Sequence, residues 1–485
     1  MSISGSLSSA LSGLTAAAKA AEVVSSNIAN ATTEGYGRRE VLTAARSVGQ
    51  SGQGVRIIGV QRHVDPVLLS DRRGAEAAQG DRSTRANFLQ RLENAVGTPD
   101  SAVSLGGRIA EFDAALLEAA SLPDSEARLA RVADTARNLA NQITGASQAV
   151  QTARAEADDR IEADVSLLNR TLAQISELNS HIRSSYAGTR DPSALIDQRQ
   201  QLIDSIAPLV PIREIARDNG QIALYTTGGA MLVDGHAGVF GFDPAGIVTA
   251  EMSVGAGSLS GLTLNGRPIA TSGPQSPIQG GRLTAHFAVR DILAPEAQTK
   301  LDALARDLVD RFASPAIDPT LAPGDAGLFT DNGGGFLAAN ELGLAQRLRV
   351  NAAIDPRQGG SLWRLRDGIG APAPGFSGNA TGLVALQTAL TEARVPASGQ
   401  FMTGARSFSA LQGDMLSAIA SNRLTAQSEA SYSAARTQAL TQLELAAGVD
   451  TDQEMQSLLM VEQAYTANAK VIQTISQMID TLLGM

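Results

Sequence analysis

The two ends of the chain carry the same spacing of apolar side chains. Near the N-terminus, small or apolar residues recur in alternating steps of four and three, at Leu7, Leu11, Leu14, Ala18, Ala21, Ser25 and Ile28. Near the C-terminus the same steps join Leu458, Val461, Tyr465, Asn468, Ile472, Ile475, Ile479 and Leu482. Such steps align side chains in one stripe along a helix and are typical of a coiled-coil seam. The pattern predicts a helix at each end, with the two helices side by side at one pole of an elongated molecule.

Helical spacing also runs through the interior. It predicts a long helix over 124–185, with an apolar stripe at Leu129, Val132, Leu139, Ile143, Val150, Ile161, Leu168, Leu172 and Ile175. Asp191-Pro192 has the residue types of a helix start, and a second stripe follows at Leu195, Ile196, Leu202, Ile203 and Ile206. A helix after Pro295 has Ala297, Leu301, Leu304, Leu308 and Phe312 on one face, and Ser314-Pro315 ends it. Two more helices are predicted near 380–394 and 404–447.

Three segments do not have helical spacing. Residues 38–62 contain "REVLTAA" and "GVRIIGVQRH", which predict a strand pair. From 221 to 289 the period becomes two, with turn signals at Gly228-Gly229 and Asn265-Gly266, and "GGRLTAHFAV" at 280–289 is predicted as a strand because Leu283, Ala285, Phe287 and Val289 alternate. Residues 314–378 are rich in Gly, Pro and Asp and predict no regular element.

These patterns predict a mainly α fold with a β insert (α+β). Residues 1–37 and 448–485 would form a terminal coiled-coil assembly domain. Residues 38–220 and 290–447 would form a mainly helical body, and residues 221–289 a β-rich outer insert. With 485 residues, the chain is long enough for several domains.

Composition removes several classes of function. The chain has no cysteine, which excludes disulfides, thiolate zinc sites and thiol nucleophiles. The net charge is -10 and no Lys/Arg-rich run occurs, so we expect no nucleic-acid or anionic-membrane partner. No run of about 18 apolar residues occurs, so we expect no membrane insertion. Ala18-Lys19-Ala20 has the form of a leader-cleavage site, but no basic segment precedes it, and the first residues are interpreted as mature structure.

No constellation of residues indicates chemistry. The four histidines, His63, His181, His236 and His286, lack metal-ligand spacing. The glycine-rich stretches at 255–261 and 333–335 do not join a strand to a helix, as a phosphate-binding loop would. The acidic pairs Asp158-Asp159 and Asp450/Asp452 are typical of solvated helix surfaces and caps. We therefore expect no catalytic residue, no metal site, no cofactor and no enzyme activity.

Two interpretations of the terminal stripes remain open at this point. In the first, the stripes pack inside one folded monomer, which is the ordinary role of apolar heptads. Alternatively they project as a pair, which would be marginal in water because the N-terminal stripe is rich in Ala and Ser. Asp450, Asp452 and Glu454 suit the N-terminal dipole of the last helix.

Both ends contain recognisable motifs. "SNIANATTEGYGRRE" at 26–40 resembles the signature of bacterial flagellar axial proteins (rod, hook and hook-associated), usually S-N-N-I-A-N-x-N-T-P-G-Y-S-R. "EQAYTANAKVIQTISQMIDTLL" at 462–483 is similar to the C-terminal signature of the same superfamily. "GTRDPSALIDQRQQLIDSIAPLV" at 188–210 and the segment 280–305 resemble the family of the first flagellar hook-associated protein. Glu34 replaces the motif's Pro and Gly37 its Ser, which makes the turn less rigid.

The N-terminal motif predicts a joint between an inner helix and an outer body. Asn27 and Asn30 would take left-handed conformations or cap exposed carbonyls at the helix end. Gly35 would have a positive φ. The Tyr36 ring would pack beside the helix end while its hydroxyl stays in water.

The resemblance implies a secreted, extracellular structural subunit at the hook–filament junction of the flagellum, exported by the type III pathway. Its partners would be further copies of itself, the hook protein and the next hook-associated protein, and an export chaperone on the C-terminal helix is a further candidate. The expected interface comprises Leu7, Leu11, Leu14, Ala18, Ala21, Ile28, Leu458, Val461, Tyr465, Ile472, Ile475, Ile479 and Leu482, on helices that fold on assembly. The alternatives are a hook or rod protein, or a hydrolase with its site in 314–378.

Overall fold

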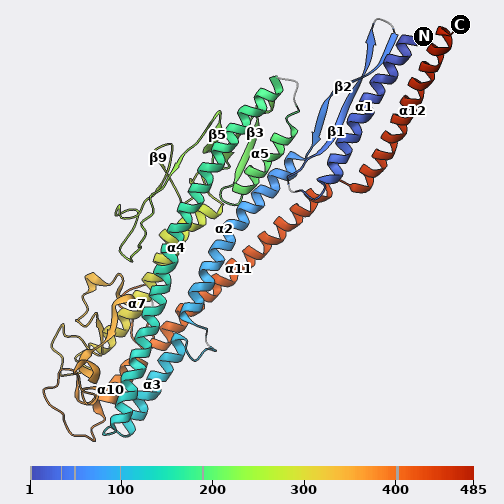
Figure 1. The fold of residues 1–485 in the computed structure, drawn as a ribbon. Helices are drawn as coiled ribbons and strands as arrows, with labels where there is room; N and C mark the ends of the chain where they lie inside the picture. The colour runs from blue at the N-terminus through green and yellow to red at the C-terminus, as the bar shows by residue number, and fades with distance from the viewer. Residues whose placement is uncertain are drawn as a thin grey trace.

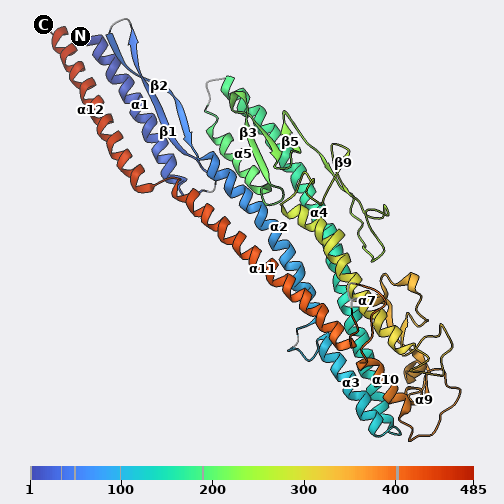
Figure 2. The ribbon, with the colours of Figure 1, turned by 180° about the vertical axis from the view of Figure 1, so that it is seen from behind.

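The chain is elongated, and its two ends lie together at one pole (Figure 1). The computed structural model describes residues 3–33, 35–48, 51–98, 100–187, 191–399 and 404–484. Seen from behind, the same long helices run the length of the molecule, and the small sheets lie on one side of them (Figure 2). The predicted fold class, mainly α with a β insert, is confirmed.

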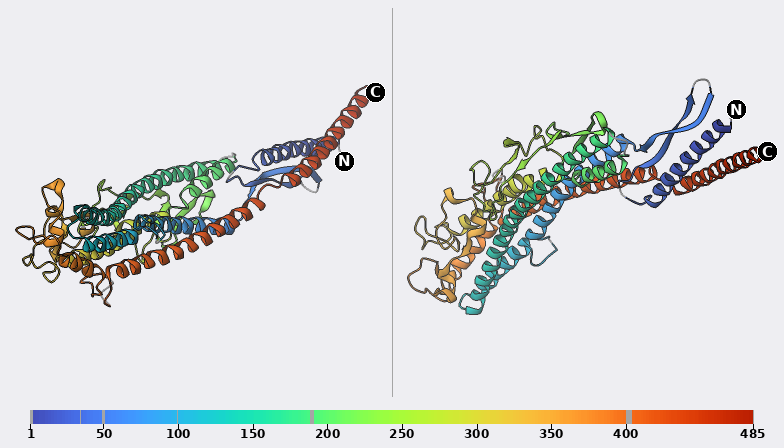
Figure 3. Two further views of the ribbon diagram at one scale, coloured as in Figure 1. Left: turned by 90° about the horizontal axis from the view of Figure 1, so that it is seen from below. Right: turned by 45° about the horizontal axis from the view of Figure 1, so that its top comes forward.

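The terminal unit consists of two helices and a hairpin. Its elements are α1 (Ile3–Ala29), β1 (Arg38–Val48), β2 (Ser51–His63) and α12 (Thr451–Leu483). The strands pair antiparallel, as predicted, and the hairpin packs on α1, where the Val55 N–H donates to Ser12 Oγ at 3.1 Å. The predicted boundary at residue 37 assigns this hairpin to the body. Because the hairpin packs on α1, we count it with the terminal unit, which extends beyond the body in Figure 3.

The body is built on long helices. They are α2 (Pro66–Val96), α3 (Leu105–Ser121), α4 (Glu126–Ala187), α5 (Ser193–Ile206), α7 (Ala294–Phe312), α10 (Thr381–Thr391) and α11 (Phe408–Ala446). The predicted helices correspond to α4, α5, α7, α10 and α11, and the whole predicted stripe of α4 is buried. The sequence did not delimit α2, because its buried side includes charged residues such as Arg72, Arg73 and Glu93.

Two hydrophobic cores hold the body. The larger core joins α2, α3, α4, α7, α10 and α11 at the end far from the termini. At its centre the Phe112, Phe312 and Phe329 rings meet with centroids 5.2–6.0 Å apart. The second core packs α4 and α5 against the β insert. Since α4 contributes to both cores, it holds the insert and the distal end in one frame.

The β insert contains two small antiparallel sheets. The first has the strands β3 (Ile212–Ala216), β4 (Ile222–Thr226), β5 (Met231–Asp234) and β6 (His236–Ala237), and the second has β7 (Phe240–Gly241), β8 (Leu262–Leu264) and β9 (Arg267–Ile269). The predicted turns are confirmed: Gly229 has φ 91°, and Asn265 and Gly266 have φ 51° and 75°. A one-turn 3₁₀ helix, η1 (Asp218–Gly220), joins β3 to β4.

The predicted strand over 280–289 is wrong. Residues Arg282–Ala288 form helix α6, and a π-helical turn, η2 (Val289–Leu293), continues it into α7. Two of the three residues between the alternating positions, Thr284 and Ala288, are buried together with Leu283, Ala285 and Phe287, and the third, His286, is half-buried. A short helix that is buried on several sides has apolar residues at consecutive positions as well as at alternating ones. The alternation in this segment therefore does not distinguish a strand from a helix.

Residues 314–378 form a compact lobe of short elements. They are β10 (Phe329–Asp331), η3 (Ala338–Asn340), α8 (Leu344–Arg347), β11 (Leu348–Val350), η4 (Ala352–Ile354), η5 (Pro356–Gln358) and α9 (Arg364–Asp367). The buried Asp302 of α7 anchors the lobe, because its carboxylate accepts the N–H groups of Gly343 and Ala345, each at 2.8 Å. Burial raises the pKa of Asp302 to about 6.

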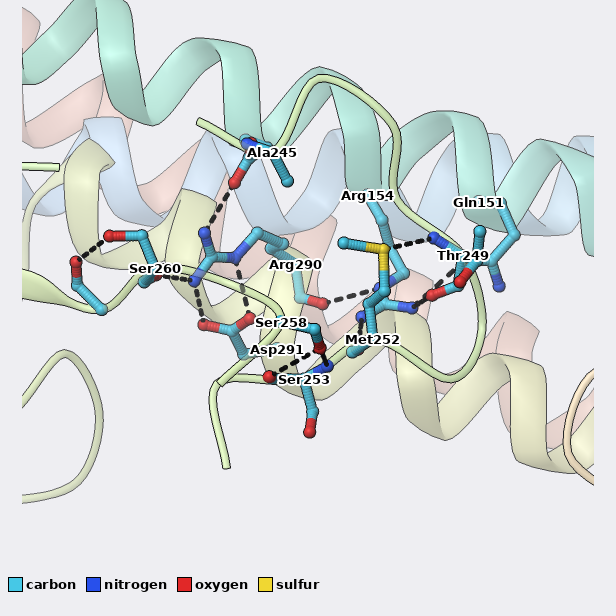
Figure 4. Close-up of polar contacts among 12 residues, drawn as sticks. Gln151, Arg154, Ala245, Thr249, Met252, Ser253, Ser258, Ser260, Arg290 and Asp291 are labelled. Atoms are coloured by element: carbon cyan, nitrogen blue, oxygen red, sulfur yellow. Dashed lines mark hydrogen bonds and ion pairs between the residues drawn. The ribbon is translucent and has the colours of Figure 1, made fainter. Parts of the chain in front are cut away.

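Two buried arginines fasten the loop between β7 and β8 to the body (Figure 4). Arg154 of α4 donates to the carbonyls of Thr249 and Met252, both at 2.7 Å. Arg290 donates to the Ser260 carbonyl at 2.8 Å and forms a buried ion pair with Asp158 at 2.6 Å. Asp158 is therefore a structural counter-ion in the interior, not the solvated helix-surface carboxylate that the sequence predicted.

The body should lose stability in acid through His286. Burial lowers the pKa of His286 to about 4, against the opposing effect of Asp164 at 3.8 Å. The unfolded chain takes up this proton at a higher pH than the folded chain, so the stability that the neutral ring provides above pH 6.5 is lost as the pH falls toward 4. Between about pH 7 and about pH 4.5, the parent should lose about 2 kcal/mol more than His286→Asn in urea unfolding. Equal losses in the two proteins would contradict this assignment.

Candidate assembly site: the terminal helix pair and its joint to the body

The terminal helices form an antiparallel pair. α1 runs from the pole toward the body, and α12 returns beside it (Figure 1). Near the middle of the pair, a Cβ on Gly13 would lie 2.8 Å from Asn468 Oδ1, so this glycine lets the Asn468 amide lie against the α1 backbone. At the end next to the body, Asn27 Nδ2 donates to Glu454 Oε2 at 2.9 Å. These two contacts define which residues of the helices face each other.

The covered stripe of α1 lies one residue before the predicted one. The positions that are buried or half-buried along it are Ser6, Ala10, Gly13, Ala17, Ala20, Val24 and Asn27. Of the predicted positions, Leu11, Ala18 and Ser25 are exposed, whereas Leu7, Leu14, Ala21 and Ile28 are half-buried. Small residues occupy the line of closest approach, and the larger leucines of the predicted stripe lie beside it.

On α12 the predicted stripe is the one turned toward α1. Ile475 is buried, and Leu458, Val461, Asn468, Ile472 and Ile479 are half-buried. Tyr465 and Leu482 from the same prediction are exposed, at 44% and 62%. Further exposed apolar side chains of the pair are Ile3, Leu11, Met455, Leu459, Met460, Val471, Met478 and Leu483. The pair therefore has uncovered apolar surface on both helices.

The Asn27 side chain is the centre of the joint, and all four of its hydrogen-bonding positions are used. Oδ1 accepts the Tyr36 hydroxyl at 2.9 Å and the Arg39 N–H at 3.0 Å. Nδ2 donates to the Arg39 carbonyl at 2.8 Å and to Glu454 at 2.9 Å. One fully buried amide thus joins α1, the turn after it, the hairpin and α12.

Glu454 is a buried charge, not only a helix-start carboxylate. Its side chain is 1% exposed, and Oε1 accepts from Arg38 Nε at 2.7 Å while Oε2 accepts from Asn27. A buried carboxylate requires such partners, because an unpaired charge in the interior is strongly unfavourable. Sequence reasoning identified Glu454 through the helix dipole and missed its pairing with Arg38.

Asp197 connects the terminal unit to the body. Lying on α5, it forms ion pairs with Arg39 and, at 2.6 Å, with Arg62 of the hairpin. It also accepts the Gly37 N–H at 3.3 Å. A Cβ at position 37 would lie 2.3 Å from Arg62 Nε, so Gly37 in place of the motif's Ser leaves room for this arginine. Sequence reasoning missed Asp197, although it lies in the "DPSALID" segment that carries the family resemblance.

The predictions for the helix-end turn have mixed outcomes. Gly35 has φ 75°, as predicted, and Asn30 caps a carbonyl, since its Nδ2 donates to Ser26 O at 2.9 Å. Of the two alternatives predicted for Asn27, the left-handed conformation is wrong because Asn27 lies within α1, and the carbonyl that its amide binds is that of Arg39 in the hairpin, not one at the helix end. The Tyr36 hydroxyl is bonded to Asn27 and is not left to water, and the Arg39 guanidinium lies 4.7 Å from the ring centroid. Glu34 lies outside the described residues.

Within the part of the chain that the structure describes, no group of three or more His, Asp or Glu residues could hold a metal ion. A cavity of about 280 Å³ lies between the terminal unit and the body, lined among others by Tyr36, Arg72 and Glu444. No helix in the described ranges has both the length and the hydropathy to span a bilayer.

Removing the Asp197 carboxylate should loosen the hairpin from the body. In Asp197→Ala, Arg39 and Arg62 lose their shared counter-ion, which leaves two partly buried cations unpaired. Amide hydrogen exchange of residues 38–63 should become faster by about tenfold or more. Asp159→Ala, which removes an exposed carboxylate from α4, is the matched control and should change nothing there. Unchanged exchange in Asp197→Ala would contradict the role given to this ion pair.

Comparison with known proteins gives matches along most of the chain. The model described as "Flagellar hook-associated protein FlgK helical domain" matches residues 89–314. "Flagellar basal body rod FlgEFG protein C-terminal" matches 445–485, and "Flagella basal body rod protein" matches 7–36. The two rod-type matches cover most of α1 and all of α12, and the hook-associated match covers all of α4, the β insert and α7.

Three curated relatives are named flagellar hook-associated protein 1. The Salmonella typhimurium protein is 30% identical over 240 residues, which cover 48% of this chain and 43% of that protein, so the alignment spans less than half of this relative. The Escherichia coli protein is 25% identical over the full length of both chains. The Bacillus subtilis protein is 23% identical over 99% of this chain and 97% of its own length.

A solved structure, that of the flagellar hook junction protein FlgK from Burkholderia pseudomallei, aligns with a TM-score of 0.43 and 22% identity, over 54% of this chain and 46% of that one. The assignment rests on the sequence matches to the ends, to the helical body and to relatives aligned over their whole length. On these matches, the chain belongs to the family of flagellar hook-associated protein 1.

Proposed function

We propose that this chain is a structural subunit of the bacterial flagellum that joins the hook to the filament. The observation that carries the proposal is the uncovered apolar surface of the α1/α12 pair. Asn27 and Glu454 join these helices to each other and to the hairpin, and Asp197 joins the hairpin to the body. Relatives of this chain are named as hook-associated proteins, which supports a structural rather than an enzymatic role. The subunit would act outside the cell after export by the flagellar type III pathway.

The terminal pair would complete its burial only among neighbouring subunits. Within α12, the buried side chains are those of Glu454 and Ile475, so the pair buries little apolar area for its length. Two helices with so small a shared core are marginal in water. Further copies of the chain would cover Leu11, Tyr465 and Leu482, which are exposed positions of the predicted interface. The remaining predicted interface positions are half-buried or exposed at the edges of the pair, apart from the buried Ile475.

The partners follow from this arrangement and from the family. We expect contacts with the hook protein on one side and with the next hook-associated protein on the other, in addition to contacts between copies. The exposed Met and Leu side chains of α12 would also suit an export chaperone that covers this helix before assembly.

Removal of α12 should separate folding from assembly. A chain without residues 450–485 loses Glu454 and the stripe that covers α1, but both body cores consist of residues outside this segment. We expect a soluble, folded body, measured by circular dichroism and cooperative unfolding, that does not join hook to filament in a strain lacking the parental protein. Normal filament assembly with the truncated chain would refute the proposal.

The free subunit should be sensitive to protease at both ends. If the terminal helices fold on assembly, limited proteolysis of the purified chain should remove about 30–40 residues from each end, because termini without packing are cleaved first. The same protease should leave these segments intact in assembled flagella. Resistance of both ends in the purified chain would favour the alternative in which α1 and α12 simply pack within a folded monomer.

A further inference from the structure

The two specific contacts between α1 and α12 share one register. Fourteen residues separate Gly13 from Asn27 on α1, and fourteen separate Glu454 from Asn468 on α12. Fourteen residues are two heptads, so each pair of contacts repeats at the same position of the seam. Because the helices are antiparallel, Asn27 against Glu454 and Gly13 against Asn468 belong to a single alignment.

We propose that Glu454 and Asn468 are positioning residues that fix the register of α12 on α1. Apart from Tyr465, which is 44% exposed, the rest of the seam consists of Ala, Ser, Val, Leu and Ile, which pack almost equally well after a slip of one heptad. Polar residues buried in such a seam are the established means by which coiled coils select one register. The register does not depend on the proposed function, although its consequence for assembly does.

A slip in either direction breaks both contacts. If α12 moved by one heptad so that Asn27 faced Val461, the Asn27 amide would lose the carboxylate and Glu454 would lose Asn27 and Arg38. In the opposite slip, Glu454 would face Ala20 and would again lose both Asn27 and Arg38. Asn468 would lie against Ala20 in the first slip and against Ser6 in the opposite slip. In both cases a Cβ occupies the space that Gly13 leaves open. The polar contacts therefore penalise both alternatives.

The register decides which surface the pair presents. A slip of one heptad displaces α12 along α1 by about 10 Å. The exposed apolar side chains of α12, such as Tyr465 and Leu482, would then lie beside different residues of α1. A neighbouring subunit that contacts both helices would meet a different composite surface, so the positioning residues set the geometry of the proposed interface.

The test uses pairs of introduced cysteines, since the chain has none of its own. Ala10 and Ile472 each lie one turn from the Gly13–Asn468 contact, on the side toward the pole, so Ala10→Cys with Ile472→Cys reports the register described here. Ala10→Cys with Ile479→Cys, or with Tyr465→Cys, reports a slip of one heptad. In flagella isolated from cells, mild oxidation should crosslink the first pair at least about tenfold faster than either slipped pair.

The same three pairs are then measured with Glu454→Gln, which keeps the shape but removes the charge that holds Arg38. The preference for the first pair should fall by about threefold or more. Glu462→Gln, an exposed carboxylate on the same helix, is the matched control and should leave the preference unchanged. Equal crosslinking of native and slipped pairs in the parent, or an undiminished preference in Glu454→Gln, would overturn the proposal.

Incorporation into flagella and the crosslinking ratio separate the two proposals. If the parental chain is not incorporated into flagella, the proposed function is contradicted. The crosslinking ratio of native to slipped pairs is then measured on the purified full-length chain, because the terminal helices would in that case pack within the monomer. A chain that is incorporated but shows no preference between pairs contradicts the register alone.

Discussion

The connection between the chain ends and the body depends on one buried side chain, the amide of Asn27. All of its donors and acceptors must be hydrogen-bonded. Asn27 can be buried only if the turn supplies Tyr36, the hairpin supplies Arg39 and α12 supplies Glu454. An amide that lost one of these partners would retain the cost of desolvation without compensation. The α1 helix, the turn, the hairpin and α12 consequently form one unit. Asp197 of α5 attaches this unit to the body through its ion pair with Arg62 of the hairpin.

The body follows a different principle. Its long helix α4 belongs to both hydrophobic cores, and the buried arginines Arg154 and Arg290 attach the irregular loop of the insert to the helical frame through backbone carbonyls. Apolar packing holds the frame, whereas charged groups hold the segments that have no regular structure of their own. The distal lobe repeats this arrangement, with Asp302 binding the backbone of residues 343–345.

Periodicity predicted the elements that bury one apolar stripe, and failed where polar residues are buried. The long helix α4 and the hairpin turn at Asn265-Gly266 were predictable because spacing or turn chemistry alone specifies them. The helix α6 was taken for a strand because it is covered on several sides. On α1 the predicted stripe was placed on the large leucines, but the covered stripe lies one residue earlier and consists mostly of small residues that permit close approach. Glu454 lies 427 residues from Asn27, and Gly37, Arg39 and Arg62 lie 135 to 160 residues from Asp197, so no local pattern indicates these contacts.

The distance along the chain between the two sides of the joint has a consequence for how the molecule is completed. Asn27 and its partner Glu454 are separated by 427 residues. Contacts between such remote segments carry a large entropic cost of loop closure and form late, after local helices and nearby pairings. The joint therefore closes only after α12 has been synthesised, and a chain that lacks α12 would leave the Asn27 amide without its carboxylate partner and one side of α1 uncovered.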